Sequence, residues 1–216
     1  MRRLGLANWI TLVRMTFIPV FLVLLLGRFG SPATWADWRP WLAAAVFTVL
    51  AATDAVDGYV ARSRNEVTTF GKFIDPLADK LLVTAALVGL VQLGSLPGWV
   101  AIVIIGRELI VSGLRMVAVA EGVVIAASPW GKVKTVFQVL ALVAFILIDA
   151  TIIPVGLRSV FTTAAWTVMA IALGLTIVSA VQYFYHARDV IAGPWSSDIP
   201  VPTPVPDQAN LRDSRR

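Results

Sequence analysis

The sequence predicts an all-α integral membrane protein with six transmembrane helices and both termini in the cytoplasm. Two observations point to this fold class. Hydrophobic residues make up 58% of the 216 residues and charged residues only 14%, whereas soluble domains contain about 45–50% and about 25%. The charged residues are also bunched, so that long stretches contain no Asp, Glu, Lys or Arg. Too few polar side chains remain to cover a globule in water, and lipid must therefore cover part of the chain.

The neutral stretches predict the individual helices, because a membrane helix needs about 20 mainly apolar residues. Each stretch with its flanks predicts one span, except residues 81–106, which contain the turn signal Gly94-Ser95-Leu96-Pro97-Gly98 and therefore divide into two helices. The neutral stretches are 15–27, 40–53, 81–106, 135–148 and 159–185. In chain order, the predicted spans are residues 8–28, 40–62, 74–93, 98–120, 132–150 and 158–185.

The basic residues predict the orientation of these helices. An even number of spans places both termini on the same side of the membrane. Most of the 18 Lys and Arg residues fall on that side, Arg107 falls inside the fourth span, and only Arg28, Arg39 and Arg158 fall on the other side. Cytoplasmic loops carry an excess of Lys and Arg. The sequence therefore predicts a multi-pass protein of the cell inner (cytoplasmic) membrane.

Two regions of different character make up the chain. Residues 1–192 are predicted as one six-helix transmembrane domain, and residues 193–216 as a Pro-rich, basic, disordered cytoplasmic tail. The first span is not a cleavable signal peptide, because it is long and contains Arg14. The absence of cysteine excludes a disulfide-stapled fold. No nucleic-acid partner is predicted, since basic residues of a membrane protein first reflect orientation and attraction to anionic lipid.

Four aspartates lie where a membrane span does not ordinarily tolerate charge. Asp54 and Asp57 are near the cytoplasmic end of the second span, and Asp75 and Asp79 open the third. Spacings of three and four residues place each pair on one helix face. Hard cations such as Mg²⁺ or Mn²⁺ prefer such all-oxygen ligands, and two ions about 4 Å apart promote displacement at phosphorus. Proton relay and cation transport remain alternatives at this point, and Asp75 can also cap its helix beside Pro76.

The residues around these aspartates form a longer motif, Asp54-x2-Asp57-Gly58-x2-Ala61-Arg62-x8-Gly71-x3-Asp75-x3-Asp79. Its glycines leave room for a ligand beside the backbone, and its arginine offers a planar fork of donors to phosphate. The motif resembles the signature of the CDP-alcohol phosphatidyltransferase family at all eight fixed positions. The resemblance implies a six-helix membrane enzyme, with two metal ions at its cytoplasmic face, in which an alcohol attacks a CDP-linked lipid and CMP leaves.

The resemblance also implies roles for individual residues. Asp54, Asp57 and Asp75 resemble the family's metal ligands, and Asp79 resembles its general base, with a further contact to the second Mg²⁺ or Mn²⁺ ion. The residues expected to contact the CDP-lipid are Gly58, Ala61, Arg62, Thr68 and Gly71, together with Asn8 and Thr11 at the start of the first span. Arg14 continues this three-residue spacing, although snorkelling of its side chain towards water explains part of the pattern.

Further segments resemble the branch of the family that transfers the phosphatidyl group from CDP-diacylglycerol to sn-glycerol 3-phosphate. They are Asn8-x2-Thr11-x2-Arg14, Asp75-Pro76-x-Ala78-Asp79-Lys80, Arg107-Glu108-x3-Ser112-x2-Leu114-Arg115, and Gly131-Lys132-x-Lys134-Thr135 with Gln138. A dianionic acceptor needs cations in its pocket, so four cations are expected to bind its phosphate: Arg107, Arg115, Lys132 and Lys134. A structural ion pair of Glu108 with Arg107 or Arg115, and lysines that only mark the membrane border, are the alternatives.

Other activities remain open on the sequence alone. Cardiolipin formation from phosphatidylglycerol and transfer to inositol phosphate share the eight-residue signature and differ in the acceptor. Membrane prenyltransferases also pair aspartate motifs with Mg²⁺, but usually without the pattern of Gly58, Ala61 and Arg62. A cation transporter would place its acids near the middle of the bilayer, whereas these lie near one face. The resemblance further implies a homodimer surrounded by membrane lipid.

Overall fold

The computed structural model describes residues 6–27, 33–64, 69–120, 129–148, 150 and 153–192. All regular structure within these ranges is helical, and no strand is present there, which confirms the all-α prediction. The described helices are α1 (Leu6–Leu26), α2 (Ala33–Arg64), α3 (Thr69–Gln92), α4 (Gly98–Ala120), α5 (Pro129–Leu147) and α6 (Val155–Ala192).

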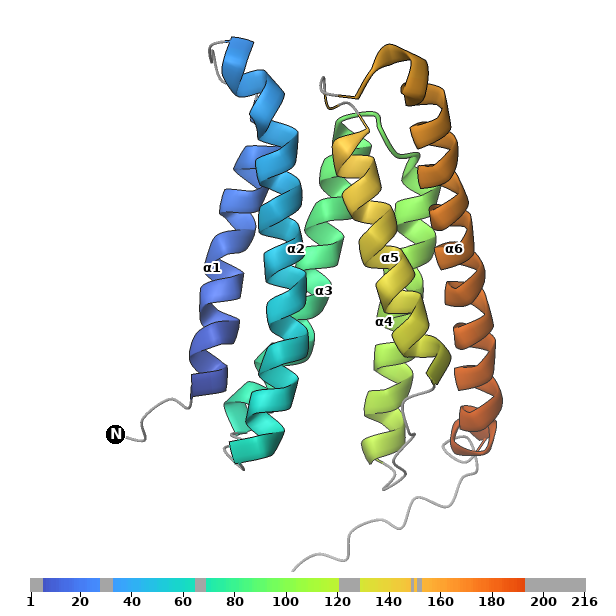
Figure 1. Cartoon of the computed structure of the whole chain (residues 1–216). Helices are drawn as coiled ribbons and strands as arrows, with labels where there is room; N and C mark the ends of the chain where they lie inside the picture. The colour runs from blue at the N-terminus through green and yellow to red at the C-terminus, as the bar shows by residue number, and fades with distance from the viewer. Residues whose placement is uncertain are drawn as a thin grey trace, which may run out of the picture.

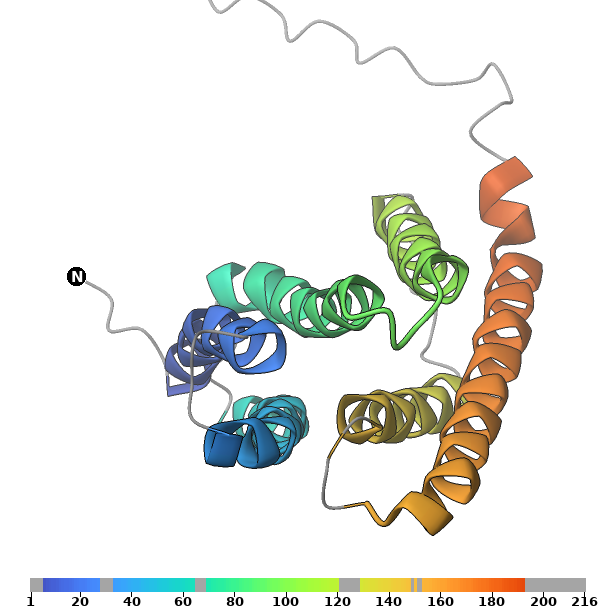
Figure 2. The ribbon, with the colours of Figure 1, turned by 90° about the horizontal axis from the view of Figure 1, so that it is seen from above.

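The six helices lie side by side and run alternately in opposite directions (Figure 1). At one end of the bundle α1, α3 and α5 begin and α2, α4 and α6 end, and we call this the signature end. The α3–α4 turn lies at the opposite end, which we call the turn end. α1 packs against α2 and α3, and α6 packs against α4 and α5 (Figure 2). α3 and α5 connect these two groups, because α3 contacts α4 and α5, and α5 contacts α2.

Large apolar side chains occupy both the inside and the outside of the bundle. Inside, the rings of Phe21 and Phe47 lie 5.5 Å apart and join α1 to α2. Outside, α4 and α6 expose a series of apolar side chains that includes Ile102, Leu109 and Val181. Such an extensive apolar exterior is typical of a surface that faces lipid or another protein. By length and composition alone, one segment of the described helices qualifies as a membrane span, Gly156–Tyr185, with a mean hydropathy of 2.0.

The helix bounds agree with the predicted spans in part. α4 covers the predicted residues 98–120, and the preceding turn is present, with Gly94 at a φ of 77°. α2 begins at Ala33 rather than at 40, with Pro40 inside the helix. α6 continues to Ala192, past the predicted end at 185. The difference arises because hydropathy detects apolar residues, whereas helical hydrogen bonding continues into polar segments. The six-span topology itself remains a prediction.

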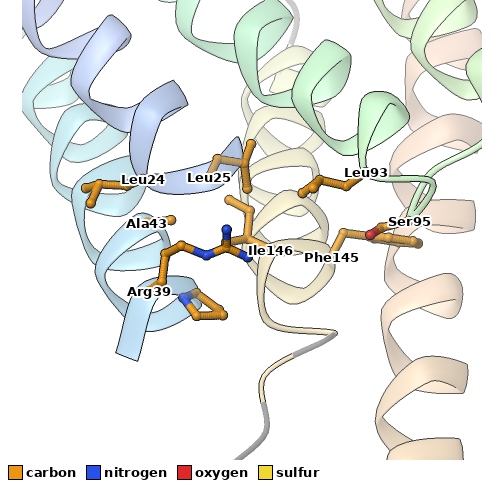
Figure 3. Close-up of a pocket in the computed structure, with 9 residues that line it drawn as sticks. Leu24, Leu25, Arg39, Ala43, Leu93, Ser95, Phe145 and Ile146 are labelled. Carbon is orange, nitrogen blue, oxygen red and sulfur yellow. The ribbon is translucent and has the colours of Figure 1, made fainter. Parts of the chain in front are cut away.

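A cavity of about 150 Å³ lies at the turn end, between the end of α1, the start of α2, the α3–α4 turn and α5. Its lining is mainly apolar, and the side chain of Arg39 extends into it from α2 (Figure 3). Nη1 of Arg39 donates a hydrogen bond to the carbonyl oxygen of Gly27, immediately after α1. A cation is favourable where a helix leaves its last carbonyls without helical partners. We therefore assign Arg39 the structural role of capping α1.

Candidate active site

The signature residues occupy two neighbouring helices at the signature end. α2 carries Asp54, Asp57, Gly58, Ala61 and Arg62 in its last turns, and α3 carries Gly71, Asp75 and Asp79 in its first turns. The backbone is helical across both segments, so the spacing of three and of four residues places each aspartate pair on one face of its helix. α2 and α3 also pack against each other. Thr68 lies outside the described residues.

The side chains of the four signature aspartates are not among those that the structure describes. Among the side chains that are described, no group of three or more acidic, histidine or cysteine residues forms a metal site. Four carboxylates on two packed, antiparallel helices are nevertheless the all-oxygen donor set that Mg²⁺ and Mn²⁺ prefer. The residues present therefore fit the two ions that the sequence predicts, and metal binding stays a prediction.

The first turns of α1 contribute buried polar side chains near the same end. Thr11 is 1% exposed and Arg14 2% exposed, and both have interaction partners. Burial of Arg14 excludes the snorkelling alternative, which requires the guanidinium to reach water. A buried arginine is costly unless it is paired, which agrees with the interaction that Arg14 makes. Asn8 lies in the first turn of α1, and its side chain is not described.

A second group of polar residues surrounds a cavity of about 80 Å³ between α3, α4 and α5. Its lining consists of Lys80, Val83, Arg107, Glu108, Gly131, Lys134, Thr135 and Gln138. Lys80 directly follows the predicted base Asp79 on α3, so the cavity begins beside the signature. Two of the four cations predicted to bind the acceptor phosphate, Arg107 and Lys134, therefore lie together. The other two, Arg115 and Lys132, are exposed and are not part of this lining.

Arg107 and Lys134 are held by a network of ion pairs and hydrogen bonds. The carboxylate of Glu108 pairs with the Lys134 ammonium and, at 3.4 Å, with Nη1 of Arg107. Nη2 of Arg107 donates a hydrogen bond of 2.7 Å to the hydroxyl of Ser179 on α6. The Arg107 guanidinium also lies 5.8 Å from the centre of the Tyr183 ring, within the range of cation–π attraction. α6 thus positions a cation that α4 carries.

The charges of the lining favour an anionic ligand. Three cations, Lys80, Arg107 and Lys134, and one carboxylate, Glu108, leave a formal charge of two positive. The side chains of Arg107 and Lys134 are only 10% and 4% exposed, and attraction between charges is stronger where water is excluded. A phosphate monoester, which carries close to two negative charges at neutral pH, matches this site in charge.

Sequence reasoning assigned no acceptor role to four residues of this network. Lys80, Gln138, Ser179 and Tyr183 all line the cavity or contact Arg107. The sequence contains a feature that points to an acceptor role for two of them. Lys80 adjoins the predicted base Asp79, and Gln138 follows the predicted phosphate ligand Lys134 by one helical turn. Ser179 lies within a long apolar helix, where a fully buried hydroxyl indicates a specific partner.

Comparison with known proteins identifies the family of this chain. The family model for CDP-alcohol phosphatidyltransferase matches residues 4–178. The chain is 45% identical over 187 residues to the CDP-diacylglycerol--glycerol-3-phosphate 3-phosphatidyltransferase of Bacillus subtilis, covering 83% of this chain and 93% of that protein. It is 40% identical over 191 residues to the probable phosphatidylglycerophosphate synthase of Mycobacterium tuberculosis, covering 88% and 84%. This chain therefore belongs to the CDP-alcohol phosphatidyltransferase family.

Proposed function

We propose that this protein transfers the phosphatidyl group from CDP-diacylglycerol to sn-glycerol 3-phosphate, giving phosphatidylglycerophosphate and CMP. The observation that carries the proposal is the cavity beside the signature, whose lining has a formal charge of two positive. Its charge complements the phosphate of the acceptor, whereas glycerol or inositol without phosphate would bring no negative charge to match the excess positive charge of the lining. Similarity to relatives named for this transfer, at up to 45% identity, supports the same assignment.

The donor substrate, CDP-diacylglycerol, would bind to the first three helices. Gly58 on α2 and Gly71 on α3 would leave space for it beside the backbone, and Arg62 would supply donors to the diphosphate. Asp54, Asp57 and Asp75 would hold Mg²⁺ or Mn²⁺, ions that neutralise charge on the reacting phosphate when bound. The acyl chains would then lie against the apolar exterior of the bundle, in the surrounding lipid.

The acceptor substrate, sn-glycerol 3-phosphate, would bind in the cavity between α3, α4 and α5. Arg107, Lys134 and Lys80 would hold its phosphate, which leaves the distal hydroxyl directed towards Asp79 at the adjoining position of α3. Asp79 would accept the proton of this hydroxyl as the oxygen bonds to the lipid-linked phosphorus. The bond between that phosphorus and the CMP oxygen breaks in the same step, so no phosphatidyl-enzyme intermediate forms and the configuration at phosphorus inverts.

The membrane arrangement is part of this proposal. Six spans with both termini in the cytoplasm would place the signature end at the cytoplasmic face of the inner membrane, in contact with the soluble substrate sn-glycerol 3-phosphate and the soluble product CMP. The excess of Lys and Arg in the segments expected on that side supports this orientation. A homodimer is expected from the family resemblance.

An acceptor panel tests the proposal directly. Purified protein is given CDP-diacylglycerol and Mg²⁺, and CMP release is followed with sn-glycerol 3-phosphate, glycerol, inositol 1-phosphate or phosphatidylglycerol as acceptor. We expect release with sn-glycerol 3-phosphate and little with the other three. Preference for phosphatidylglycerol or inositol 1-phosphate would instead assign the protein to a sibling activity, and no CMP release with any alcohol would overturn the phosphatidyl-transfer assignment.

A further inference from the structure

The cavity beside the signature contains one buried polar group that the proposed phosphate site does not use, the side-chain amide of Gln138. Gln138 is 4% exposed and lines the cavity from α5. Its Oε1 has no hydrogen-bond partner among the described residues. A buried amide oxygen without a donor is unfavourable and uncommon in folded proteins. Such an acceptor indicates that a ligand supplies the missing donor.

Gln138 offers this cavity a buried, neutral hydrogen-bond acceptor. Lys134, one helical turn before it, carries only donors, and the Glu108 carboxylate is already engaged by Lys134 and Arg107. The hydroxyl of Thr135 donates its proton to the carbonyl of Gly131 at 3.0 Å, and its oxygen can still accept, but Thr135 is exposed and can meet water instead. Rotation about the terminal bond of a glutamine side chain is soft. The amide oxygen of Gln138 can therefore turn to meet a hydroxyl group that enters the cavity.

The chemistry of the acceptor leaves one hydroxyl for this contact. In sn-glycerol 3-phosphate the phosphate has no proton to donate near neutral pH, and it is matched by the cations of the cavity. The C1 hydroxyl is the nucleophile, and its proton passes to the base. The C2 hydroxyl is the remaining donor, and it lies between the nucleophilic C1 hydroxyl and the bound phosphate.

We propose that Gln138 accepts a hydrogen bond from the C2 hydroxyl of the acceptor and thereby selects glycerol 3-phosphate over phosphates that lack this hydroxyl. This assignment rests on the proposed function and adds a specificity-determining residue to it. A pocket that hydrogen-bonds a substrate hydroxyl discriminates against the analogue without it, because its own polar group is then left buried and unpaired. For one such group the loss is about 5- to 150-fold in kcat/KM.

The test compares two acceptors that differ only at C2, sn-glycerol 3-phosphate and 3-hydroxypropyl phosphate. We expect the wild-type protein to prefer the first by about 5- to 150-fold in kcat/KM. Gln138→Met keeps the size of the side chain and removes the acceptor, so it should lower kcat/KM for sn-glycerol 3-phosphate and leave 3-hydroxypropyl phosphate nearly unaffected. The ratio between the two acceptors should then approach one. Gln92→Met, at an exposed position at the end of α3, is the matched control and should keep the wild-type ratio.

Gln138→Glu provides a second readout that does not depend on the Met variant folding. A carboxylate still accepts a hydrogen bond but repels the acceptor phosphate, so KM should rise for both acceptors while the preference between them persists. Equal use of both acceptors by the wild-type protein, or full preference retained in Gln138→Met, would overturn the assignment. If the wild-type protein accepts neither phosphate but transfers to another alcohol, the proposed function fails, and this assignment fails with it.

Discussion

Arg107 on α4 and Ser179 on α6 are joined by a hydrogen bond of 2.7 Å, from the guanidinium to a hydroxyl that is fully buried. The same hydroxyl donates to the carbonyl of Thr176, at 3.1 Å, on its own helix. Its position is therefore set by α6, and the direction of the Arg107 side chain follows from it. A helix that contributes no residue to the signature thus orients a cation of the proposed acceptor site.

Ser179 should act as a positioning residue for Arg107. Ser179→Ala removes one hydrogen bond to a charged group, worth about 1.5–3 kcal/mol, and should raise KM for sn-glycerol 3-phosphate by at most roughly 10- to 150-fold. KM for CDP-diacylglycerol should stay unchanged, since the proposed donor site lies on other helices. Steady-state kinetics with each substrate varied in turn make the measurement, with Ser159→Ala, exposed near the start of α6, as the control. Equal changes in both KM values would indicate a general loss of structure instead.

Lys134 should matter more for the acceptor than Lys132, although both were predicted to bind it. Lys134 is buried and lines the cavity, whereas Lys132 is exposed. A hydrogen bond to a charged group contributes about 1.5–3 kcal/mol, so Lys134→Met should raise KM for sn-glycerol 3-phosphate roughly 10- to 150-fold. Lys132→Met should have a much smaller effect. A larger effect at Lys132, with folding of both variants checked in detergent, would contradict the assignment of the cavity to the acceptor.

Activity should depend strictly on a divalent cation. Exhaustive chelation should abolish CMP release, and Mg²⁺ or Mn²⁺ should restore it, because the signature offers only carboxylate oxygens. Asp54→Asn should remove turnover even at saturating Mg²⁺, since it lowers the charge of the expected ligand set. Turnover that survives chelation would exclude the proposed role of the metal ions.

The signature end should face the cytoplasm. The chain contains no cysteine, so single cysteines report their surroundings without interference. In intact spheroplasts, an impermeant maleimide should label Gln92→Cys, at the turn end, and should label Ser214→Cys, in the tail, only after the membrane is permeabilised. The opposite labelling would invert the proposed topology, and labelling of both sites from outside would exclude three spans between residues 92 and 214.

Gly89 should be required for close packing of α3 against α1. A Cβ atom at this position would lie 2.6 Å from Cδ2 of the buried Leu25. Gly89→Leu should therefore destabilise the protein by about 1–3 kcal/mol, as overpacking does, and lower the midpoint of thermal unfolding in detergent. Gly174→Leu is the matched control, because a Cβ there meets no atom within 4 Å. An unchanged midpoint in Gly89→Leu would show that the two helices separate at little cost.

The sequence alone determined the class of the fold, the bounds of α4 and the helical placement of the signature. These features are local: apolar composition, a turn containing Gly94, and spacings of three and four residues act within one helix and its immediate flanks. The start of α2 was placed too late for the same reason, because hydropathy does not register helical turns formed by polar residues around Pro40.

The tertiary structure decided which cations meet. Lys132 and Lys134 are two residues apart, which separates them by about 200° around a helix, so only one of them can face a given neighbour. Which one does so depends on how α5 rotates against α3 and α4. The orientation of the Arg107 side chain in the cavity likewise depends on a hydrogen bond to Ser179, a residue far from it in sequence. Spacing along one helix fixes which residues share a face. Which helix packs against that face is set by the packing of all six helices, because the arrangement that buries the most apolar surface and pairs the most polar groups is the most stable.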